Sequence, residues 1–300
     1  MSSKRIVMCS STSSLEYAPE RYRNLGIELI RVIVVFEGKE YHEGLDLNPY
    51  DFFKKLETIE DPKSNLPHSA NPVLAEIAEK YQSAIDRGYD EIIVVTLGSS
   101  LGGTYNSIKL VKEDFKDKIK ITIIDSGIAG FGEGMLAAQV ADLVKKDVPT
   151  ETIVKEIEWS KAHQEFIGVC GKLDYLVYNG RLKGGQAFIG KALSICPVLD
   201  FTHDGRLETF AKVMSPRKAN ERMCEELLKR IGNRKSEDYY LWHNFSGEHS
   251  ADMIKEVEKK YGIICNHEDV IGSPVIGCHT GPYLAGYGLF FKRREDEPLS

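Results

Sequence analysis

Apolar runs and amphipathic stretches alternate along the first half of the chain. Residues 91–97 form a continuous apolar run bounded by turn residues, which is typical of a strand buried on both faces. Shorter apolar runs at 5–9 and 120–125 predict two further strands. Apolar positions recur at helical spacing within residues 74–85 and 136–143. This alternation of strands and helices predicts a parallel sheet with helices on both faces.

Between the strands predicted at 5–9 and 91–97, the pattern predicts a hairpin, a helix and a loop. Residues 27–36 form a long β-branched run that predicts one strand, and the turn at Gly38 predicts a hairpin. Asn48 before Pro49 predicts the start of a helix, because asparagine caps helices and proline suits the first helical position. Prolines interrupt residues 57–71, which predict a loop.

The second half of the chain mixes hairpins with helices. The turn His203-Asp204-Gly205 between two apolar runs predicts a β-hairpin. The expected elements are a helix capped by Thr150, strands at 166–169, 197–201 and 207–213, a helix at 216–231, a strand at 239–244, a helix at 248–260, and strands at 263–270 and 284–292. We therefore predict an α/β protein with a parallel-sheet N-terminal domain, 1–160, and a smaller α+β C-terminal domain, 161–300.

Composition and charge narrow the class of partner. Hydrophobic residues make up 42% of the chain and charged residues 28%, close to the average for globular proteins. The 39 basic and 45 acidic residues give a net charge of −6, which argues against a nucleic-acid binder because such proteins carry a basic surface. We expect no membrane span and no signal peptide, because no apolar run is long enough.

The six cysteines include no Cys-x-x-Cys pair. This spacing predicts reduced, mostly buried thiols and argues against both a zinc site and a disulfide framework. Because reduced cysteines are typical of proteins in a reducing compartment, we expect a cytoplasmic protein.

A loop rich in glycine and serine, residues 98–107, follows the central strand. It contains Gly-x-Ser-x-Gly with Ser100 in the position of a nucleophile, in the strand–turn–helix context of a serine hydrolase. Asp200 and His279 follow it in the order of a hydrolase triad. The loop also fits the binding of an anion or carboxylate by hydroxyls and free amides at this edge of a sheet. An ordinary turn is the third explanation.

Two other small-residue segments lie near the predicted sheet. The hydroxyl cluster at residues 10–14 either caps a helix or contributes to a ligand pocket through Ser11 and Thr12. Residues 132–137 match Gly-x-Gly-x-x-Ala, but six residues separate them from the preceding strand. A dinucleotide-binding motif follows its strand tightly, so close packing of a helix on the sheet is the alternative.

Three further loops carry polar residues among prolines or glycines. They are residues 66–72 with Ser69, residues 179–185 with Arg181, and residues 277–282 with His279 and Thr280. An arginine between glycines can bind a carboxylate or phosphate through two parallel hydrogen bonds. The structural alternatives are a surface connection, a solvated turn and a buried histidine, respectively.

Taken in order, these segments resemble the motifs of the DegV family, bacterial two-domain fatty-acid-binding proteins. The resemblance covers nearly the whole chain. The matching segments are residues 10–15 (D-S-T-S-D-L in the family), 38–44 with the residues after them (G-K-x-Y-x-D-G-x-D), 67–72 (P-x-T-S-Q-P), 99–107 (S-x-L-S-G-T-Y-x-S), 124–126 (D-S after a strand), 173–199 (L-x-Y-L-x-x-G-R-I…G-x-x-L-x-x-x-P-I-L) and 277–282 (G-x-H-T-G-P).

The resemblance implies a long-chain fatty acid in a tunnel between the two domains, and a fatty-acid kinase that phosphorylates the bound acid. It implies a non-catalytic protein with no metal and no cofactor apart from the fatty acid as ligand. The ligand-binding residues that it implies are Ser69, Ser99, Arg181, His279 and Thr280, with Ser11, Thr12, Ser100 and Gly102 as further candidates.

The chain departs from the family pattern near the expected head-group site. Ser10 replaces an aspartate, Gly98 and Gly102 replace serines, and Ala70 and Asn71 replace serine and glutamine. Fewer hydroxyls therefore reach the head group, so its hydrogen bonds are expected to differ. Two other functions stay open: a serine hydrolase that uses Ser100 and His279, and a sensor of a small anion or nucleotide.

Overall fold

The structure is a computed structural model of the 300-residue chain. It describes residues 4–59, 65–185, 195–202, 204–267, 269–294 and 297–299, except for the side chains of residues 248, 249 and 251. Parts of the predicted N-terminus, of the loop at 57–71, of the hairpin turn at His203 and of the family-like segment 173–199 therefore lie outside the described residues.

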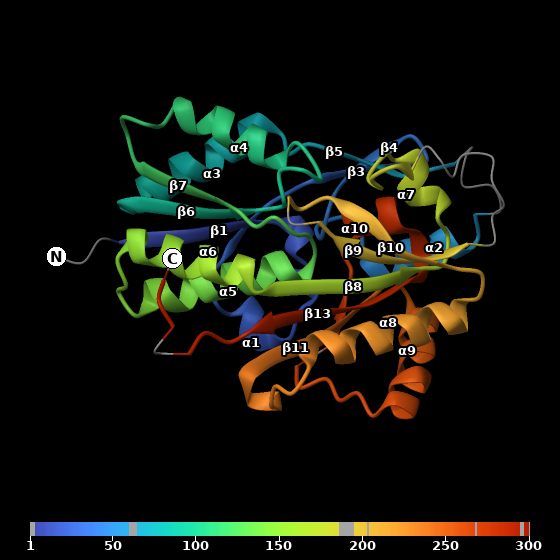
Figure 1. Cartoon of the computed structure of the whole chain (residues 1–300). Helices are drawn as coiled ribbons and strands as arrows, with labels where there is room; N and C mark the ends of the chain where they lie inside the picture. The colour runs from blue at the N-terminus through green and yellow to red at the C-terminus, as the bar shows by residue number, and fades with distance from the viewer. Residues whose placement is uncertain are drawn as a thin grey trace.

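A four-stranded parallel sheet forms the core of the first half. Its strand order is β2 (Glu28–Ile30), β1 (Arg5–Ser10), β6 (Glu91–Thr96) and β7 (Lys120–Asp125). Figure 1 shows helices on both sides of it: α3 (Leu74–Asp86) and α4 (Thr104–Glu113) on one side, α5 (Phe131–Lys145) and α6 (Thr150–Ala162) on the other. Alternate residues of β1 and β6 enter the two resulting cores. The predicted doubly covered parallel sheet is thus confirmed.

A six-stranded, mostly antiparallel sheet dominates the second half. Its order is β10 (Leu207–Val213), β9 (Cys196–Phe201), β8 (Gln164–Cys170), β13 (Leu284–Phe291), β11 (Tyr239–Phe245) and β12 (Val270–Ile271). The helices α8 (Pro216–Ile231) and α9 (Glu248–Tyr261) cover one face. The other face packs against the first half, where Trp242 and Phe290 join the core around α5. The predicted mixed α/β fold class is therefore confirmed.

A small third sheet packs against helices from both halves of the chain. Its order is β4 (Lys39–His42), β3 (Ile33–Phe36) and β5 (His68–Ala70), and it packs against α2 (Pro49–Glu57) and α10 (Pro274–Thr280). Phe52 and Phe53 from α2 share one core with Tyr175, Val275 and Cys278 from the second half. The division into residues 1–160 and 161–300 stays a prediction, because each half contributes to the cores of the other.

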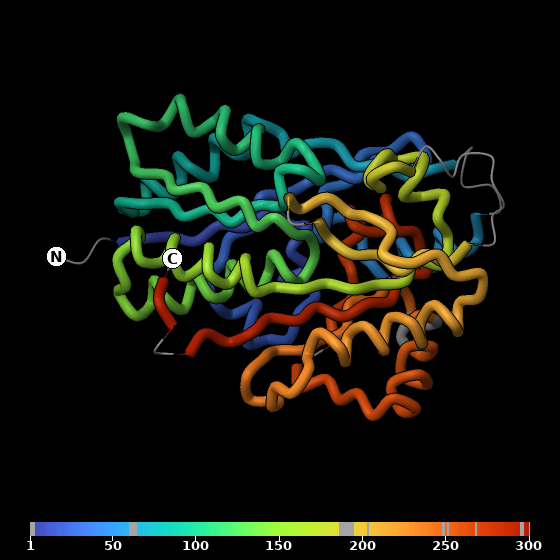
Figure 2. Tube along the Cα trace, viewed as in Figure 1, coloured from blue at the N-terminus to red at the C-terminus, as the bar shows by residue number. Residues whose placement is uncertain are grey.

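The remaining short helices are α1 (Glu20–Arg23) and α7 (Asp174–Tyr178), and the single-turn 3₁₀ helices include η1 (Ser11–Ser13), η2 (Leu15–Tyr17) and η5 (Gly281–Tyr283). In Figure 2 the chain after β13 returns to the side of the molecule where β1 begins. There Arg293 forms an ion pair with Glu156 of α6 at 2.8 Å.

The structure corrects two predictions about the first half. The predicted single strand at 27–36 is two strands, β2 and β3, that belong to different sheets. The chain crosses between them at Arg31 and Val32, where the Val32 N–H donates to the Ser11 hydroxyl at 3.0 Å instead of to a neighbouring strand. The predicted loop at 57–71 contains β5, whose Ser69 pairs with Val34 of β3.

Two predictions about the second half are also wrong in detail. Thr150 does not cap α6: Pro149 holds the cap position, and the Thr150 hydroxyl donates to Glu91 at 2.8 Å. Of the strand predicted at 263–270, only Val270 belongs to a strand, β12. Before β12, the Asn266 side chain makes the hydrogen bonds to the backbone of β11. Its Oδ1 accepts from the Leu241 N–H at 2.8 Å, and its Nδ2 donates to the Tyr239 carbonyl at 2.9 Å.

Candidate functional site

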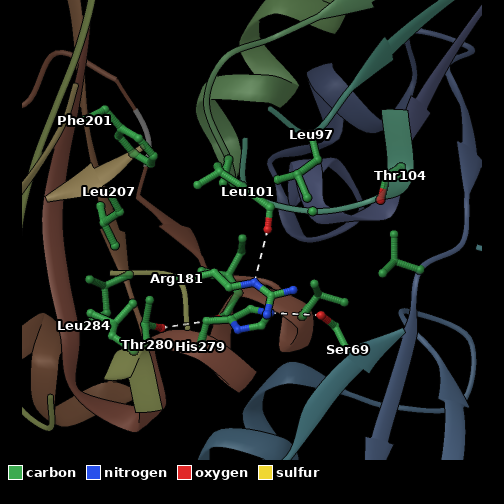
Figure 3. A pocket seen from close by; sticks show the side chains of 18 of the residues that line it. Ser69, Leu97, Leu101, Thr104, Arg181, Phe201, Leu207, His279, Thr280 and Leu284 are labelled. Atoms are coloured by element: carbon green, nitrogen blue, oxygen red, sulfur yellow. Dashed lines mark hydrogen bonds between the residues drawn. The ribbon is translucent and has the colours of Figure 1, made fainter. Parts of the chain in front are cut away.

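A pocket lies where the carboxyl end of β6 meets α10 and the inner face of the six-stranded sheet. The pocket has a volume of about 980 Å³, which includes the part that is open to solvent. Figure 3 shows its side chains converging from both halves of the molecule, with Arg181, His279 and Ser69 gathered at one place. Long apolar side chains surround this polar group.

The apolar part of the pocket is built mainly by the alternation of strand residues. In β9, Val198 points into the core under α8, so Leu199 and Phe201 point to the opposite face and line the pocket. The other large apolar lining side chains come from several elements and are Val32, Leu97, Leu101, Phe166, Leu176, Leu207, Val275, Ile276 and Leu284. A surface of this kind favours a hydrocarbon ligand, because it removes apolar area from water.

Arg181 supplies a positive charge inside this apolar surface. Its Nε donates to the Leu101 carbonyl at 3.2 Å and its Nη1 to the Asn179 carbonyl at 2.6 Å, which holds the guanidinium against the loop after β6. Burial lowers the pKa of the guanidinium from 12.5. Arg181 makes no ion pair with any acidic group that the structure describes, and its Nη2 has no partner there. An unpaired, half-buried cation of this kind favours an anionic ligand.

His279 and Ser69 form the second polar contact of the pocket. The His279 Nε2 lies 2.9 Å from the Ser69 hydroxyl oxygen, which joins α10 to β5. Burial, followed by the nearby charges of Arg181 and His68, lowers the pKa of His279 from 6.5 to about 3, so its imidazole is neutral. Its Nδ1 is buried without a hydrogen-bond partner among the described residues. A ligand oxygen could bind there.

The amino end of α4 also faces the pocket. Gly102, Gly103 and Thr104 line it, and Gly103 caps the helix without a side-chain hydrogen bond. The first amides of such a helix attract anions. A Cβ atom at position 103 would lie 2.5 Å from Oδ1 of Asn71, another lining residue, so a side chain there would displace the Asn71 amide. The departure to Asn71 thus leaves an amide at the polar end of the pocket.

The structure brings together five of the nine predicted binding residues. The pocket is lined by Ser69, Gly102, Arg181, His279 and Thr280, whereas Ser11, Thr12, Ser99 and Ser100 are not among its lining residues. Ser99 is exposed and its N–H donates to Asp125 at 3.0 Å. The Ser100 hydroxyl donates to the Gly205 carbonyl at 2.7 Å, so it fixes the β9–β10 hairpin to the loop.

The hydroxyls of Ser10, Ser11 and Thr12 hydrogen-bond to two buried carboxyl groups. The Ser11 hydroxyl donates to Glu43 and the Thr12 hydroxyl to Glu133, each at 2.6 Å. The Ser10 hydroxyl also donates to Glu133. This contact explains one departure from the family pattern, since an aspartate at position 10 would place a second carboxylate against the Glu133 carboxyl. The alternative that these hydroxyls cap a helix is wrong, because neither η1 nor η2 has a side-chain capping hydrogen bond.

The buried Glu43 also positions part of the pocket. Its Oε1 accepts from the Val275 N–H at 2.9 Å, at the start of the helix that carries His279 and Thr280. The carboxyl is fully buried, and this burial raises its pKa from 4.5. Sequence reasoning missed Glu43 and Glu133. An acidic residue inside an otherwise family-like segment, 38–44, was the available signal for Glu43.

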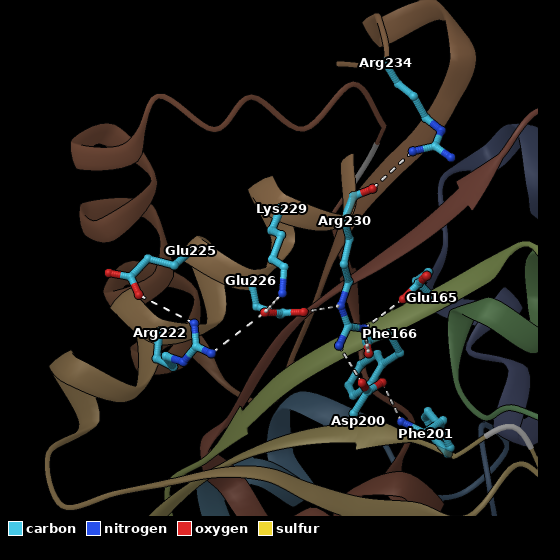
Figure 4. A network of polar contacts seen from close by, with 10 residues as sticks. All are labelled: Glu165, Phe166, Asp200, Phe201, Arg222, Glu225, Glu226, Lys229, Arg230 and Arg234. Atoms are coloured by element: carbon cyan, nitrogen blue, oxygen red, sulfur yellow. Dashed lines mark hydrogen bonds and ion pairs between the residues drawn. The ribbon is translucent and has the colours of Figure 1, made fainter. Parts of the chain in front are cut away.

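The serine hydrolase constellation is not assembled in the described part of the chain. Ser100 is bonded to a carbonyl rather than to His279, whose Nε2 contacts Ser69. Asp200, the candidate acid, accepts from Arg230 at 2.5 Å. Figure 4 shows that Arg230 also binds Glu165 and Glu226, so Asp200 belongs to an ion-pair network under α8. A triad needs the base between nucleophile and acid, and no such chain of contacts exists here.

The small-residue segment at 132–137 has a packing role. Gly134 allows α5 to approach the turn after β1, because a Cβ atom there would lie 2.7 Å from the Ser13 carbonyl oxygen. The Gly-x-Gly-x-x-Ala segment thus serves close packing, as its alternative explanation predicted.

All six cysteines are free thiols and five are buried, which confirms the prediction of mostly buried thiols. No helix within the described residues has the length and apolarity to cross a membrane.

Comparison with known proteins agrees with this architecture. The model of the uncharacterised DegV protein family, COG1307, matches residues 5–292. The chain belongs to the DegV family. A DegV domain-containing protein of Listeria innocua is 30% identical over 276 residues, which span 92% of this chain and 95% of the relative. One from Clostridium acetobutylicum is 27% identical over 286 residues, 95% of this chain and 99% of the relative. The family resemblance inferred from the motifs is confirmed.

Solved structures of DegV proteins share the fold. A fatty-acid-binding DegV protein from Streptococcus agalactiae superposes with a TM-score of 0.84 at 24% identity, covering 97% of this chain and 100% of that one. DegV from Bacillus subtilis, described as a fatty acid binding protein, gives a TM-score of 0.78 at 26% identity, with 97% and 100% coverage. A stearic-acid-binding protein from Eubacterium ventriosum gives 0.81 at 21% identity, with 95% and 98% coverage.

Proposed function

We propose that this protein binds a long-chain fatty acid in the pocket described above, with the carboxylate at Arg181. The observation that carries the proposal is the arginine without an acidic partner among the described residues, set within an apolar pocket. A fatty acid complements both features. The 26% identical DegV of Bacillus subtilis, described as a fatty acid binding protein, supports the same ligand class.

The proposed binding mode divides the ligand between two environments. The hydrocarbon tail lies along the leucine and phenylalanine side chains, where each buried methylene contributes about 0.8 kcal/mol. The carboxylate accepts from the Arg181 guanidinium, from the amides at the start of α4 and from a neutral His279. A tunnel closed around the tail is part of this proposal. So are the five lining residues Ser69, Gly102, Arg181, His279 and Thr280 as the head-group site.

Native mass spectrometry tests the ligand class. We expect protein purified from a bacterial host to carry one acyl chain per molecule, which is released on denaturation. After delipidation, oleate or palmitate should restore the mass and raise the unfolding temperature. A protein that carries no acyl chain and binds neither added acid would refute the proposal.

Replacing the arginine tests the binding mode. Arg181→Ala should raise the dissociation constant for oleate about 10- to 100-fold, since a hydrogen bond to a charged group contributes about 1.5–3 kcal/mol. Displacement of a fluorescent fatty acid measures this change. Lys183→Ala is the matched control, because Lys183 is exposed and pairs with Glu208 at 3.4 Å. Equal affinities of both variants and the unaltered protein would exclude Arg181 from the head-group site.

We further propose that the protein is non-catalytic and presents the bound carboxylate to a fatty-acid kinase in the cytoplasm. The family resemblance supports this role, and the exposed opening of the pocket is compatible with it. Incubation of the oleate-loaded protein with a bacterial fatty-acid kinase and ATP should produce acyl phosphate. Free oleate under the same conditions should react far more slowly. Equal rates with free and protein-bound oleate would contradict presentation.

A further inference from the structure

A second cluster of chemically reactive side chains lies on the other face of the six-stranded sheet. His243 in β11 points toward α9, whereas its neighbour Asn244 lines the fatty-acid pocket, because successive strand residues point to opposite faces. Glu258 of α9 and Cys265 of the following loop meet His243 there. The imidazole is buried, and the carboxylate and thiol are largely covered.

The three side chains place one nitrogen, one oxygen and one sulfur around a common point. His243 Nε2 contacts Glu258 Oε1 directly, Cys265 Sγ lies 3.5 Å from His243 Nε2, and it lies 3.7 Å from Glu258 Oε1. In a tetrahedral zinc site, with bonds of about 2.3 Å to sulfur and about 2.0 Å to nitrogen or oxygen, ligand atoms lie about 3.5 Å apart. The two contacts of the sulfur match this separation, whereas the direct contact between His243 and Glu258 is shorter and would have to lengthen to admit the ion.

Outer contacts orient the cluster as metal ligands are usually oriented. The other imidazole nitrogen of His243, Nδ1, lies 2.5 Å from Asp269 Oδ1, so the aspartate fixes Nε2 toward the cluster. The Tyr287 hydroxyl, opposite His243 in the β11–β13 pairing, donates to Glu258 at 3.1 Å. A carboxylate behind a ligating histidine is the common arrangement in zinc proteins, because it sets the tautomer and the ring orientation.

The charges of the cluster are also those of a cation site. Glu258, Asp269 and the ionisable thiol of Cys265 surround a single imidazole. Among the described residues, the exposed Lys255 pairs with Asp269 at 4.0 Å. A divalent cation would balance Glu258 and a Cys265 thiolate completely. Sequence spacing could not indicate this site, since its residues come from a strand, a helix and a loop.

We propose that His243, Glu258 and Cys265 bind Zn²⁺, with water as the fourth ligand and Asp269 as the positioning residue behind His243. The site is separate from the fatty-acid pocket and does not depend on it. The competing explanation is an ion-pair network in which a protonated His243 bridges Glu258 and Asp269. That network would hold no metal, so metal binding distinguishes the two.

Zinc titration of the full chain tests the proposal. Protein stripped with a chelator should take up one Zn²⁺ per chain in competition with a chromophoric chelator. Cys265→Ser should weaken binding at least about 100-fold, and Asp269→Asn about 10- to 100-fold, as loss of an outer hydrogen bond does in zinc enzymes. Cys196→Ser is the matched control, because that buried thiol lies in β9, three positions away from β11 in the sheet order. No stoichiometric uptake would overturn the proposal.

Two further measurements keep the test independent of how the variants fold. In the unaltered protein, Co²⁺ should give the charge-transfer band of a thiolate ligand and the intense visible bands of a tetrahedral site. Zn²⁺ should also protect Cys265 from iodoacetamide, as peptide mass spectrometry can measure. A cobalt spectrum without the thiolate band, or an unchanged rate of alkylation, would overturn the assignment of Cys265. If the folded Cys265→Ser variant kept the thiolate charge-transfer band, Cys265 would also be excluded as the ligand.

Discussion

Ser69 and His279 are 210 positions apart in the chain, yet their side chains lie 2.9 Å from each other. At the scale of single residues, burial decides the chemistry of such groups. His279 is held neutral by burial, which lowers its pKa to about 3. Glu133 is affected in the opposite direction, because burial raises the pKa of its carboxyl from 4.5 to about 8. Both shifts favour the uncharged form.

The raised pKa of Glu133 predicts a pH-dependent stability. The folded protein keeps a proton on this carboxyl that the unfolded chain releases above its ordinary pKa of 4.5. The contribution of this group to the free energy of unfolding is therefore fully present below that pH and is lost as the pH rises toward about 8. We expect the free energy of unfolding to fall by about 3–5 kcal/mol over this window, on the order given by the shift.

Urea unfolding between these pH values, followed by circular dichroism, measures the effect. Glu133→Gln should remove this fall in stability, because glutamine stays uncharged throughout. The exposed Glu113 offers the matched control, and Glu113→Gln should keep the dependence of the unaltered protein. The same pH dependence in both variants would contradict the raised pKa.

At the scale of elements, side chains take the place of strand pairing in the region after α9. The apolar residues between Ile263 and Val270 resemble a strand in sequence. In the structure, Asn266 instead makes the hydrogen bonds that an edge strand would make with β11. A similar replacement splits residues 27–36, where the Ser11 hydroxyl binds the Val32 N–H. Hydrophobic pattern cannot reveal which hydrogen-bond partner a backbone will find.

This role of Asn266 predicts a measurable loss of stability. Asn266→Ala leaves the Leu241 N–H and the Tyr239 carbonyl without these partners, and we expect a cost of about 1–3 kcal/mol. Denaturant unfolding measures it. The exposed Asn233 is the control, since Asn233→Ala should change stability by less than about 0.5 kcal/mol. A neutral Asn266→Ala would show that its hydrogen bonds do not support β11.

At the scale of the whole molecule, the two halves share their cores. The Phe131 ring of α5 lies 5.6 Å from the Trp242 ring of β11 and 5.1 Å from the Tyr22 ring. Glu43 reaches α10 from the first half, and Arg181 reaches the loop after β6 from the second. The pocket lies within this set of contacts, so its geometry depends on both halves together.

Shared cores predict cooperative unfolding. Fluorescence from the two tryptophans, Trp159 and Trp242, and circular dichroism should give coincident urea transitions. Phe131→Ala should lower the stability of the whole chain by about 3–5 kcal/mol, as deletion of a buried aromatic side chain does. Leu110→Ala, at a side chain that is 60% exposed, is the control and should have little effect. Separate transitions would show that the halves fold independently.

Local sequence patterns were sufficient to predict most of the strands and helices and to identify the family. Continuous apolar runs predicted the parallel strands, Asn48 and Pro49 predicted the start of α2, and seven ordered motifs identified the DegV family. These signals are local, because hydrophobic periodicity and capping depend on neighbours along the chain. They also named Ser69, Arg181, His279 and Thr280, which line the pocket.

The partners of the hydroxyls and charged groups depend on long-range packing. Ser11, Thr12 and Ser100 carry the same groups as Ser69, but their partners are Glu43, Glu133 and a hairpin carbonyl. His243, Glu258 and Cys265 meet only because a strand, a helix and a loop converge. Whether a polar side chain binds a ligand or another residue depends on which distant segment packs against it, and no local pattern in the sequence contains that information.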